Sequence, residues 1–410
     1  MTHPSSICII GSGHCGGRTA QVLRELGFAG RIDLVGDEPG VPYERPALSK
    51  DVLTAAKPLE QLDLTTEAQL QQWDIQRHHA RVQAVDPVAR SVQLSDGQAL
   101  SYGALLFANG GAPRRLSIPG ADLPQVFTLR TKADAQRLAP QLAPGRRIVV
   151  IGGGFIGLEV AASARTLGCH VHLLEGAPQL MGRAVPGLIA DRALALYQAQ
   201  GVHIRVGVSP LQITQRGTAL EVALSDGTAL AADAVVVGIG IVPGTEVAQA
   251  AGLQVARGIL VDRCLRTSVD HIYAAGDVAE VPSHLTGALQ RQETWQNAES
   301  QARVVAQNLM GGNVEFAASA WFWSDQFDHQ LQVSGEPTAG THTTVREMGD
   351  GDVLLFYTDA SQRLVGASGW GLSARIAKNL KLARTLVERG VVASSEALAN
   401  PDTKLKSLLR

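Results

Sequence analysis

The sequence predicts an α/β protein with two Rossmann-like dinucleotide-binding domains, and an internal repeat is the main reason. Residues 7–17 read ICIIGSGHCGG and residues 148–158 read IVVIGGGFIGL, so each contains G-x-G-x-x-G after an apolar, β-rich run. A helical stretch follows each motif, and then a second strand that ends on an acidic residue. The motifs are 141 residues apart, from Gly11 to Gly152, which suits a duplicated domain and is too long for a solenoid repeat.

The glycines of the two motifs predict two phosphate-binding turns. They are Gly11, Gly13 and Gly16 in the first motif and Gly152, Gly154 and Gly157 in the second. The first glycine permits the tight turn, the second lets a pyrophosphate approach the backbone, and the third lets the helix pack closely against the strand. One such motif among 43 glycines is weak evidence. Two motifs in the same strand–helix context predict two dinucleotide sites, because the N-terminus of each helix then meets a phosphate.

An acidic residue ends the second strand of each repeat, RIDLVGDE at 31–38 and HVHLLE at 170–175. Glu175 lies 18 residues beyond Gly157, close to the roughly 20 residues typical of the acid that binds a ribose diol. A carboxylate there favours the free 2′-hydroxyl of NAD over the 2′-phosphate of NADP, although Arg183, eight residues on, can weaken this preference. The alternative for Glu175 is a strand end in solvent.

The acid of the first repeat is less sharply defined. Glu38 lies 22 residues beyond Gly16, and Asp37 is the adjacent competitor. We expect one of these two carboxylates to bind the ribose of the first dinucleotide.

Composition and charge exclude several classes of protein. A chain of 410 residues should hold two to four domains. Its net charge of −2 lacks the basic excess that a general nucleic-acid binder needs. The N-terminal MTHPSS lacks the parts of a signal peptide, and no run approaches 18 apolar residues, so we expect a cytoplasmic protein without a membrane segment. The four cysteines form no CxxC, so we expect neither a metal site nor a disulfide framework.

Six blocks in order carry a resemblance that covers nearly the whole chain. They are GDEPGVPYERPALSK (36–50), GGGFIGLE (152–159), VGIGIVP (237–243), IYAAGDVAEV (272–281), RQETWQNAESQA (291–302) and WFWSDQFD (321–328). With these blocks the sequence resembles the FAD-dependent pyridine nucleotide oxidoreductases. More narrowly, it resembles the NADH-dependent ferredoxin reductases of bacterial oxygenase systems, with putidaredoxin and rubredoxin reductases as relatives.

The resemblance implies a set of flavin contacts. It places Arg45 and Lys50 beside the flavin, with Lys50 near the reactive N5 edge, and Asp277 at the ribityl chain. Trp295 falls near the pyrimidine side and Trp323 near the ring. Further cofactor contacts are expected from Val82, Gly240, Gln296 and Gln326. For Asp277 a helix N-cap is a compatible role.

The resemblance also implies an ion pair between Lys50 and Glu159, which lies in the first turn of the helix after the second motif. The helix dipole alone favours a carboxylate at that position. Lys50, Glu159 and Trp323 are therefore the candidates for a catalytic role.

The domain order follows from the resemblance and from the return of a flavin-type block at 272–281. We expect a discontinuous FAD-binding domain of residues 1–112 and 245–322. The NAD-binding domain, residues 113–244, is inserted between them, and a C-terminal α+β domain of residues 323–410 follows.

The C-terminal domain is expected to contain strands at 353–359 and 363–370 and a helix at 372–389. The last 40 residues hold three acidic residues and eight basic ones, namely Arg375, Lys378, Lys381, Arg384, Arg389, Lys404, Lys406 and Arg410. Such a region is commonly only solvated, but it can also steer an acidic partner. We expect an acidic iron–sulfur ferredoxin to dock near it.

The cysteine pattern limits the chemistry. No Cys occurs between Cys15 and Cys169, so the redox-active cysteine pair of glutathione-reductase-type relatives is absent. The resemblance then implies an NADH-dependent ferredoxin reductase, in which a hydride passes from NADH to FAD and single electrons pass to a [2Fe–2S] ferredoxin that feeds an oxygenase. The alternatives are a rubredoxin or small-acceptor reductase, an NADH-responsive binding protein like apoptosis-inducing factor, and a flavoprotein with a vestigial second site.

Two positions depart from the family pattern. Asn109, within LLFANGGAP at 105–113, replaces the usual Thr and is followed by an extra Gly. Cys15 stands inside the first glycine motif, where we expect an exposed thiol at a helix N-terminus with a lowered pKa.

Overall fold

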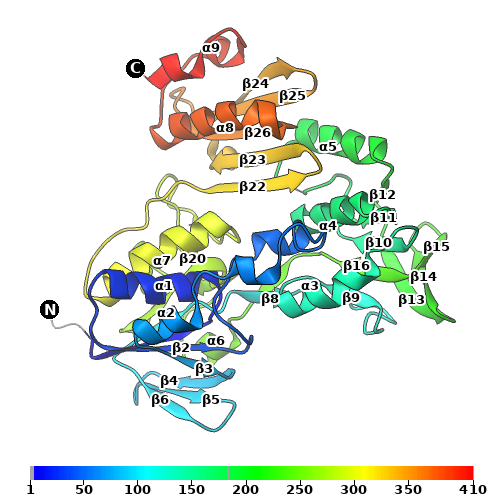
Figure 1. Cartoon of the computed structure of the whole chain (residues 1–410). Coiled ribbons are helices and arrows are strands. Elements are labelled where there is room, and N and C mark those ends of the chain that lie inside the picture. The colour runs from blue at the N-terminus through cyan, green and yellow to red at the C-terminus, as the bar shows by residue number, and fades with distance from the viewer. Residues whose placement is uncertain (1–3, 183, 410) are drawn as a thin grey trace. The chain divides into compact units, whose positions relative to one another are not determined.

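The computed structural model describes residues 4–182 and 184–409 (Figure 1). The chain divides into two compact units. The first unit combines the segment up to Arg45 with Glu60–Ala112 and Val242–Ala320. The second combines Pro46–Leu59, Pro113–Ile241 and the segment from Trp321 onward. The expected division into FAD, NAD and C-terminal domains stays a prediction.

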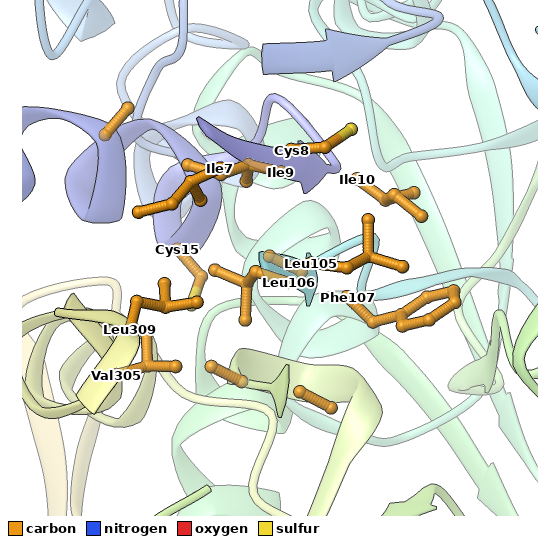
Figure 2. Close-up of a cluster of buried hydrophobic side chains, with 14 of the residues drawn as sticks. Ile7, Cys8, Ile9, Ile10, Cys15, Leu105, Leu106, Phe107, Val305 and Leu309 are labelled. Carbon is orange, nitrogen blue, oxygen red and sulfur yellow. The ribbon is translucent and has the colours of Figure 1, made fainter. Parts of the chain in front are cut away.

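A five-stranded parallel sheet organises the first unit, in the order β19-β7-β1-β2-β3. The strands are β1 (Ser6–Ile10), β2 (Arg31–Gly36), β3 (Ile75–His79), β7 (Ala104–Phe107) and β19 (Ile272–Ala274). Every residue of β1 and β7 is buried, as apolar runs in a parallel sheet covered on both faces should be. Their side chains form the core of the unit together with Val305 and Leu309 (Figure 2).

Two helices of the first unit, α1 (His14–Glu25) and α7 (Trp295–Leu309), pack against each other. Glu299 of α7 joins them, since it accepts hydrogen bonds from His14 Nε2 at 3.2 Å and from Arg18 Nε at 3.0 Å. This contact fixes the helix that begins at the first glycine motif.

The second unit repeats the architecture. Its parallel sheet has the order β12-β11-β10-β16-β9. The strands are β9 (Val126–Thr128), β10 (Arg147–Ile151), β11 (His170–Glu175), β12 (His203–Val206) and β16 (Ala234–Val237). The helix α4 (Phe155–Thr166) follows β10 as α1 follows β1, so the predicted strand–glycine–helix repeat is confirmed.

The chain ends in an antiparallel sheet of the order β22-β23-β26-β25-β24. Its strands are β22 (Trp321–Gln326), β23 (His329–Gly335), β24 (His342–Gly349), β25 (Asp352–Thr358) and β26 (Leu364–Leu372). The helix α8 (Ser373–Glu388) packs on this sheet through an apolar core that includes Leu354, Phe356 and Leu380. The strands expected at 353–359 and 363–370 and the helix expected at 372–389 are confirmed.

Smaller elements complete the two units. In the first part of the chain these are α2 (Glu67–Gln72), β4 (Val82–Asp86), β5 (Ser91–Leu94), β6 (Ala99–Ser101) and β8 (Gly111–Pro113). The middle part adds α3 (Lys132–Leu138), α5 (Gly187–Ala199), β13 (Pro210–Arg216), β14 (Ala219–Leu224) and β15 (Ala229–Ala232). The others are β17 (Ile241–Pro243), α6 (Glu246–Ala250), β18 (Ile259–Leu260), β20 (Ala279–Pro282), β21 (Leu289–Gln290) and α9 (Ser395–Ala399). No helix within residues 4–182 and 184–409 is long and apolar enough to cross a membrane.

Candidate active site

The first glycine motif joins β1 to α1 by a turn that only glycine can make. Gly11 has φ +111°, and a Cβ on it would lie 2.4 Å from the carbonyl oxygen of Ala108. A Cβ on Gly16 would lie 1.8 Å from the carbonyl oxygen of Gly11, so α1 can approach β1 only without a side chain there. Both glycines therefore have the structural roles that the motif predicts.

The second motif has the same geometry between β10 and α4. Gly152 has φ +110°, and its Cβ would lie 2.4 Å from the carbonyl oxygen of Gly238. A Cβ on Gly157 would lie 2.0 Å from the carbonyl oxygen of Gly152.

The middle glycine of each motif leaves room for a pyrophosphate. Within residues 4–182 and 184–409, a Cβ on Gly154 would meet no atom within 4 Å, and one on Gly13 would meet only Arg45 Nη2, at 3.7 Å. Among the described residues, the N-caps of α1 and α4 are Gly13 and Gly154, which have no side chain to bind the first N–H groups of these helices. Open space beside uncapped N–H groups at a helix N-terminus fits a dinucleotide pyrophosphate.

The two acids considered for the first ribose have different surroundings. Glu38 accepts hydrogen bonds from Tyr43 Oη, at 2.5 Å, and from Arg45 Nη2. Asp37 instead pairs with Arg81, whose Nε lies 2.8 Å away, and both of these side chains are exposed. Glu38 therefore belongs to the polar group beside Gly13, whereas Asp37 faces solvent.

Glu175 at the end of β11 binds the backbone of its own loop. One carboxylate oxygen accepts the N–H of Gly153 at 2.6 Å, and the other accepts the N–H of Ala177 at 2.7 Å. This fixes the carboxylate next to the second glycine motif, and each oxygen keeps a second lone pair for a further donor. Arg183, the other residue considered for coenzyme choice, lies outside the described residues.

The expected ion pair between Lys50 and Glu159 forms within the second unit, with 3.7 Å between Lys50 Nζ and Glu159 Oε1. Glu159 lies in α4 and is buried. Its carboxylate also accepts hydrogen bonds from Ser49 Oγ at 2.5 Å and from Ser324 Oγ at 2.7 Å. Burial raises the pKa of Glu159, against the opposing effects of Lys50 and the two hydroxyl groups.

A second carboxylate, Asp325, holds the other side of the Lys50 ammonium group, at 3.1 Å. Asp325 also accepts a hydrogen bond from Trp323 Nε1 at 3.1 Å. The ammonium group lies 5.8 Å from the centre of the Trp323 ring, within the range of a cation–π contact. Lys50, Glu159 and Trp323 are thus brought together, and their catalytic roles remain predictions.

Sequence reasoning did not single out Asp325, Ser49 or Ser324. A usable signal was present in WFWSDQ, because side chains alternate between the two faces of a strand. Alternation on β22 puts Asp325 on the face of Trp323 and puts Ser324 on the opposite face.

Gln326, expected near the flavin, lies on the same face of β22 as Ser324. It is buried, and its Nε2 lies 3.3 Å from Ser324 Oγ and 3.9 Å from the sulfur of Met181.

Other residues that were expected to contact a cofactor lie at or near the ends of helices and strands. Asp277 lies in a one-turn 3₁₀ helix after β19, and its carbonyl oxygen accepts a hydrogen bond from Arg291. Trp295 is the first residue of α7, and its indole N–H donates to Glu44 at 3.1 Å. Val82 begins β4 and packs against the core of the first unit. Gly240 has φ +95° with open space where a Cβ would be.

The remaining expected residues also have defined surroundings. Gln296 follows Trp295 in α7 and donates to Ser300. Asn109 donates from Nδ2 to the carbonyl oxygen of Gly244 at 2.7 Å. The amide therefore supplies a local hydrogen bond at the position where the family has Thr.

The expectation of an exposed, acidic thiol at Cys15 is wrong. The side chain lies in the core of the first unit, and it is 6% exposed (Figure 2). Burial raises the pKa of the Cys15 thiol, with a further contribution from the charge of Asp277. Although Cys15 is the second residue of α1, its burial in this core is the main influence on the pKa of the thiol.

The comparisons with known proteins agree with this geometry. Residues 5–302 match the family model of the pyridine nucleotide-disulphide oxidoreductases, and residues 321–409 match a reductase C-terminal domain. The chain is 38% identical to the ferredoxin–NAD(+) reductase component of the anthranilate 1,2-dioxygenase system of Burkholderia cepacia, over 98% of each chain. It is 39% identical to rhodocoxin reductase of Rhodococcus erythropolis, over 98% of this chain and 93% of the relative.

Two solved structures extend the similarity to the whole fold. The ferredoxin reductase for the CYP199A2 system from Rhodopseudomonas palustris has a TM-score of 0.93 at 36% identity, covering 98% of this chain and 99% of that one. The covalent putidaredoxin reductase–putidaredoxin complex has a TM-score of 0.93 at 33% identity, covering 99% and 98%. With two glycine motifs of matching geometry and a match over most of its length, the chain belongs to the pyridine nucleotide-disulphide oxidoreductase family.

Proposed function

We propose that this chain is the NADH-dependent reductase of an oxygenase system and that it passes electrons through bound FAD to a [2Fe–2S] ferredoxin. The observation that carries the proposal is the full-length similarity to ferredoxin–NAD(+) reductase components. The cysteines agree with it, because all four are buried and unpaired. No dithiol is therefore available to carry electrons onward, and unpaired cysteines are typical of a cytoplasmic protein.

The first unit supplies the FAD site in this proposal. The N–H groups at the start of α1 bind the pyrophosphate, and Glu38 accepts the ribose hydroxyls while Arg45 and Tyr43 hold its carboxylate in place. When bound, FAD supplies the redox chemistry, because it takes two electrons from NADH and returns them one at a time.

The second unit supplies the NADH site. The start of α4 binds the pyrophosphate beside Gly154, and Glu175 accepts the 2′-hydroxyl of the ribose. A 2′-phosphate would meet the carboxylate of Glu175, so NADH is the preferred coenzyme. Lys50, held between Glu159 and Asp325, is the cation that orients the carboxamide of the nicotinamide.

Partner docking is assigned to the exposed lysines of α8. Arg375 was expected to join this basic surface, but its guanidinium pairs with Asp350 at 2.8 Å and with Asp352 at 2.9 Å. Lys378 and Lys381 are exposed and have no ion-pair partner among the described residues. These two lysines are therefore the cations of α8 that can meet an acidic ferredoxin.

The test is anaerobic electron transfer from NADH to putidaredoxin, catalysed by the FAD-loaded protein and followed by the bleaching of the iron–sulfur band. We expect turnover that falls as ionic strength rises, because salt screens the attraction between the partners. A protein that oxidises NADH with ferricyanide but with no iron–sulfur protein would contradict the proposal and would favour a small-acceptor reductase. Because ferredoxins differ in surface charge, putidaredoxin and an anthranilate dioxygenase ferredoxin should both be tried.

A charge reversal locates the docking surface. Lys378→Glu should raise the KM for ferredoxin by about tenfold at low salt and leave the reduction of ferricyanide unchanged, because a like charge replaces an attraction. Arg216→Glu reverses an exposed charge on β13 that pairs with Glu221, and this control variant should change neither value. Equal effects of the two variants would exclude a local contact at α8.

A further inference from the structure

Three hydrogen-bond donors converge on the carboxylate of Asp325. Lys50 Nζ and Trp323 Nε1 each lie 3.1 Å from Oδ2, and Gln330 Nε2 lies 2.8 Å from Oδ1. An ionised carboxylate accepts hydrogen bonds and donates none, so it can satisfy all three donors at once. These donors come from separate parts of the second unit, namely the segment Pro46–Leu59 and the strands β22 and β23.

The contacts continue along the face of β22 and β23 that carries Asp325. Gln332 Nε2 donates to Gln330 Oε1 at 2.6 Å, and Trp321 Nε1 donates to Gln332 Oε1 at 3.1 Å. The strand register aligns these side chains in a row, because Asp325 lies opposite Gln330 and Trp323 lies opposite Gln332. Each of these hydrogen bonds is donated in the direction of Asp325.

The indoles of Trp321 and Trp323, which begin and end this chain of hydrogen bonds, stack on each other. The ring centres of Trp321 and Trp323 are 5.0 Å apart with 23° between the planes. The guanidinium of Arg384, on α8, lies over the indole of Trp321, 4.6 Å from the centre of its ring. The stack thus runs from the Lys50 ammonium group to α8, and each indole N–H has an acceptor that fixes its rotation.

We propose that Asp325 is a positioning residue, which holds Lys50 and the stacked pair Trp321–Trp323 in one arrangement for electron transfer. The proposal rests on the proposed function, because Lys50 is assigned there to the reacting rings and α8 to the partner. Six residues form this group, called here the Asp325 network: Lys50, Trp321, Trp323, Asp325, Gln330 and Gln332. The side chain of Asp325 is 39% exposed, so its role is not to fill the core.

Because every partner of Asp325 is a donor, the network is sensitive to the replacement of one carboxylate oxygen of Asp325 by an NH₂ group. Asn in place of Asp325 would put an NH₂ group against Lys50 and Trp323, or against Gln330 if the amide turned over. In the second case Gln330 and then Gln332 would also have to turn over, and Trp321 would lose its acceptor. Either way one donor faces another donor, which a carboxylate prevents.

The test is Asp325→Asn in the full-length, FAD-loaded protein, observed through the indole N–H resonances of its five tryptophans. We expect the signals of Trp321 and Trp323 to shift and the other three to stay in place. We also expect the rate of flavin bleaching by NADH to fall by about tenfold or more, because a displaced positioning group loses pre-organisation. An unchanged spectrum and an unchanged rate would overturn the proposal.

Two further variants separate positioning from general damage. Asp328→Asn alters a neighbouring exposed carboxylate that pairs with His329, whose ring lies 5.6 Å from that of Trp370. It should leave the signals of Trp321 and Trp323 and the bleaching rate as they are. Gln332→Met removes the acceptor of Trp321 and should shift that signal without shifting Trp323. If Asp328→Asn reproduced the effect of Asp325→Asn, the network would have no specific role.

The outcome is independent of the identity of the electron acceptor. A wild-type protein that is bleached by NADH but reduces no ferredoxin would contradict the proposed function. The indole signals and the bleaching rate of Asp325→Asn would still decide whether Asp325 positions Lys50 and the two indoles.

Discussion

The two glycine loops have the same backbone but hold their acidic residues in different ways. Gly11 and Gly152 have φ of +111° and +110°, and the third glycine of each loop lies against the carbonyl oxygen of the first. Glu38, however, accepts hydrogen bonds from two side chains of its own unit, whereas Glu175 accepts two backbone N–H groups of its own loop.

The comparison distinguishes the backbone geometry that serves any dinucleotide from the contacts of the acid, which differ between the two units. The shared backbone serves the pyrophosphate, which is common to FAD and NADH. In the first unit an arginine and a tyrosine hold the acid, and in the second unit two backbone N–H groups of the loop hold it. Both carboxylates are therefore fixed before a dinucleotide binds, each by contacts particular to its own unit.

The largest effects are expected from the third glycines. Gly157→Ala should cost about 1–3 kcal/mol of stability, because the new Cβ would lie 2.0 Å from a carbonyl oxygen. The protein should remain yellow but lose its response to NADH, whereas Gly16→Ala should lose the flavin. Flavin content and anaerobic bleaching measure both. If both variants lost the same cofactor, the two loops would not have separate ligands.

Gly154→Ala tests the second loop without disturbing its packing. Its Cβ would meet no atom of the described part of the chain within 4 Å, and its φ of −78° suits any residue, so the thermal midpoint should not change. The KM for NADH should nevertheless rise by about tenfold or more, because the methyl group occupies the space of the pyrophosphate. An unchanged KM would show that no phosphate binds there.

A smaller effect is expected at the acids. Glu175→Gln should lower the ratio of kcat/KM for NADH to that for NADPH by about tenfold, since it removes the charge that repels a 2′-phosphate. Steady-state kinetics with both coenzymes measure the ratio. Glu38→Gln is the control in the other loop, and it should weaken flavin retention without changing the ratio. A changed ratio in Glu38→Gln would contradict the assignment of the two loops.

The smallest effect concerns the contact between α1 and α7. Burial alone would raise the pKa of Glu299, but hydrogen bonds from His14 and Arg18 outweigh it and lower the pKa to about 2. Because the pKa is lowered by folding, this contribution to stability is present above about pH 4.5 and is lost as the pH falls toward 2. Glu299→Gln should therefore cost about 1–2 kcal/mol at pH 7 and progressively less below pH 4.5.

Urea unfolding between pH 7 and pH 3 measures this difference. Glu25→Gln is a suitable control, because Glu25 also pairs with Arg18 but has a side chain that is 45% exposed. An exposed pair contributes about 0–1 kcal/mol, so the control should show little change. A constant difference between wild type and Glu299→Gln at all pH values would contradict the role of the carboxylate.

Local patterns predicted much of this molecule. The roles of Gly11 and Gly16 in the turn and in the helix packing follow from three glycines between an apolar strand and a helix, and the structure has both. The strands at 353–359 and 363–370 and the helix at 372–389 were also predicted from local sequence. Each of these depends on neighbours a few residues apart in the sequence.

Partners distant in the sequence could not be predicted in this way. Cys15 was expected to be exposed, because the sequence does not show that its side chain points into the core of the first unit. Arg375 was expected to be free, because nothing local shows that β25 brings Asp352 to it. Asp325 was passed over, although strand alternation places it on the face of Trp323, because its donors Lys50 and Gln330 come from other segments.

The most direct test of the account is anaerobic rapid mixing of the FAD-loaded protein with NADH and, separately, with NADPH. Fast bleaching of the flavin band by NADH and much slower bleaching by NADPH is the predicted result, since it requires both loops to be filled and Glu175 to select the coenzyme. Slow bleaching by NADH into a long-lived charge-transfer state would contradict the account and would favour an NADH-responsive binding protein. No response to either coenzyme would show that the second loop is vestigial.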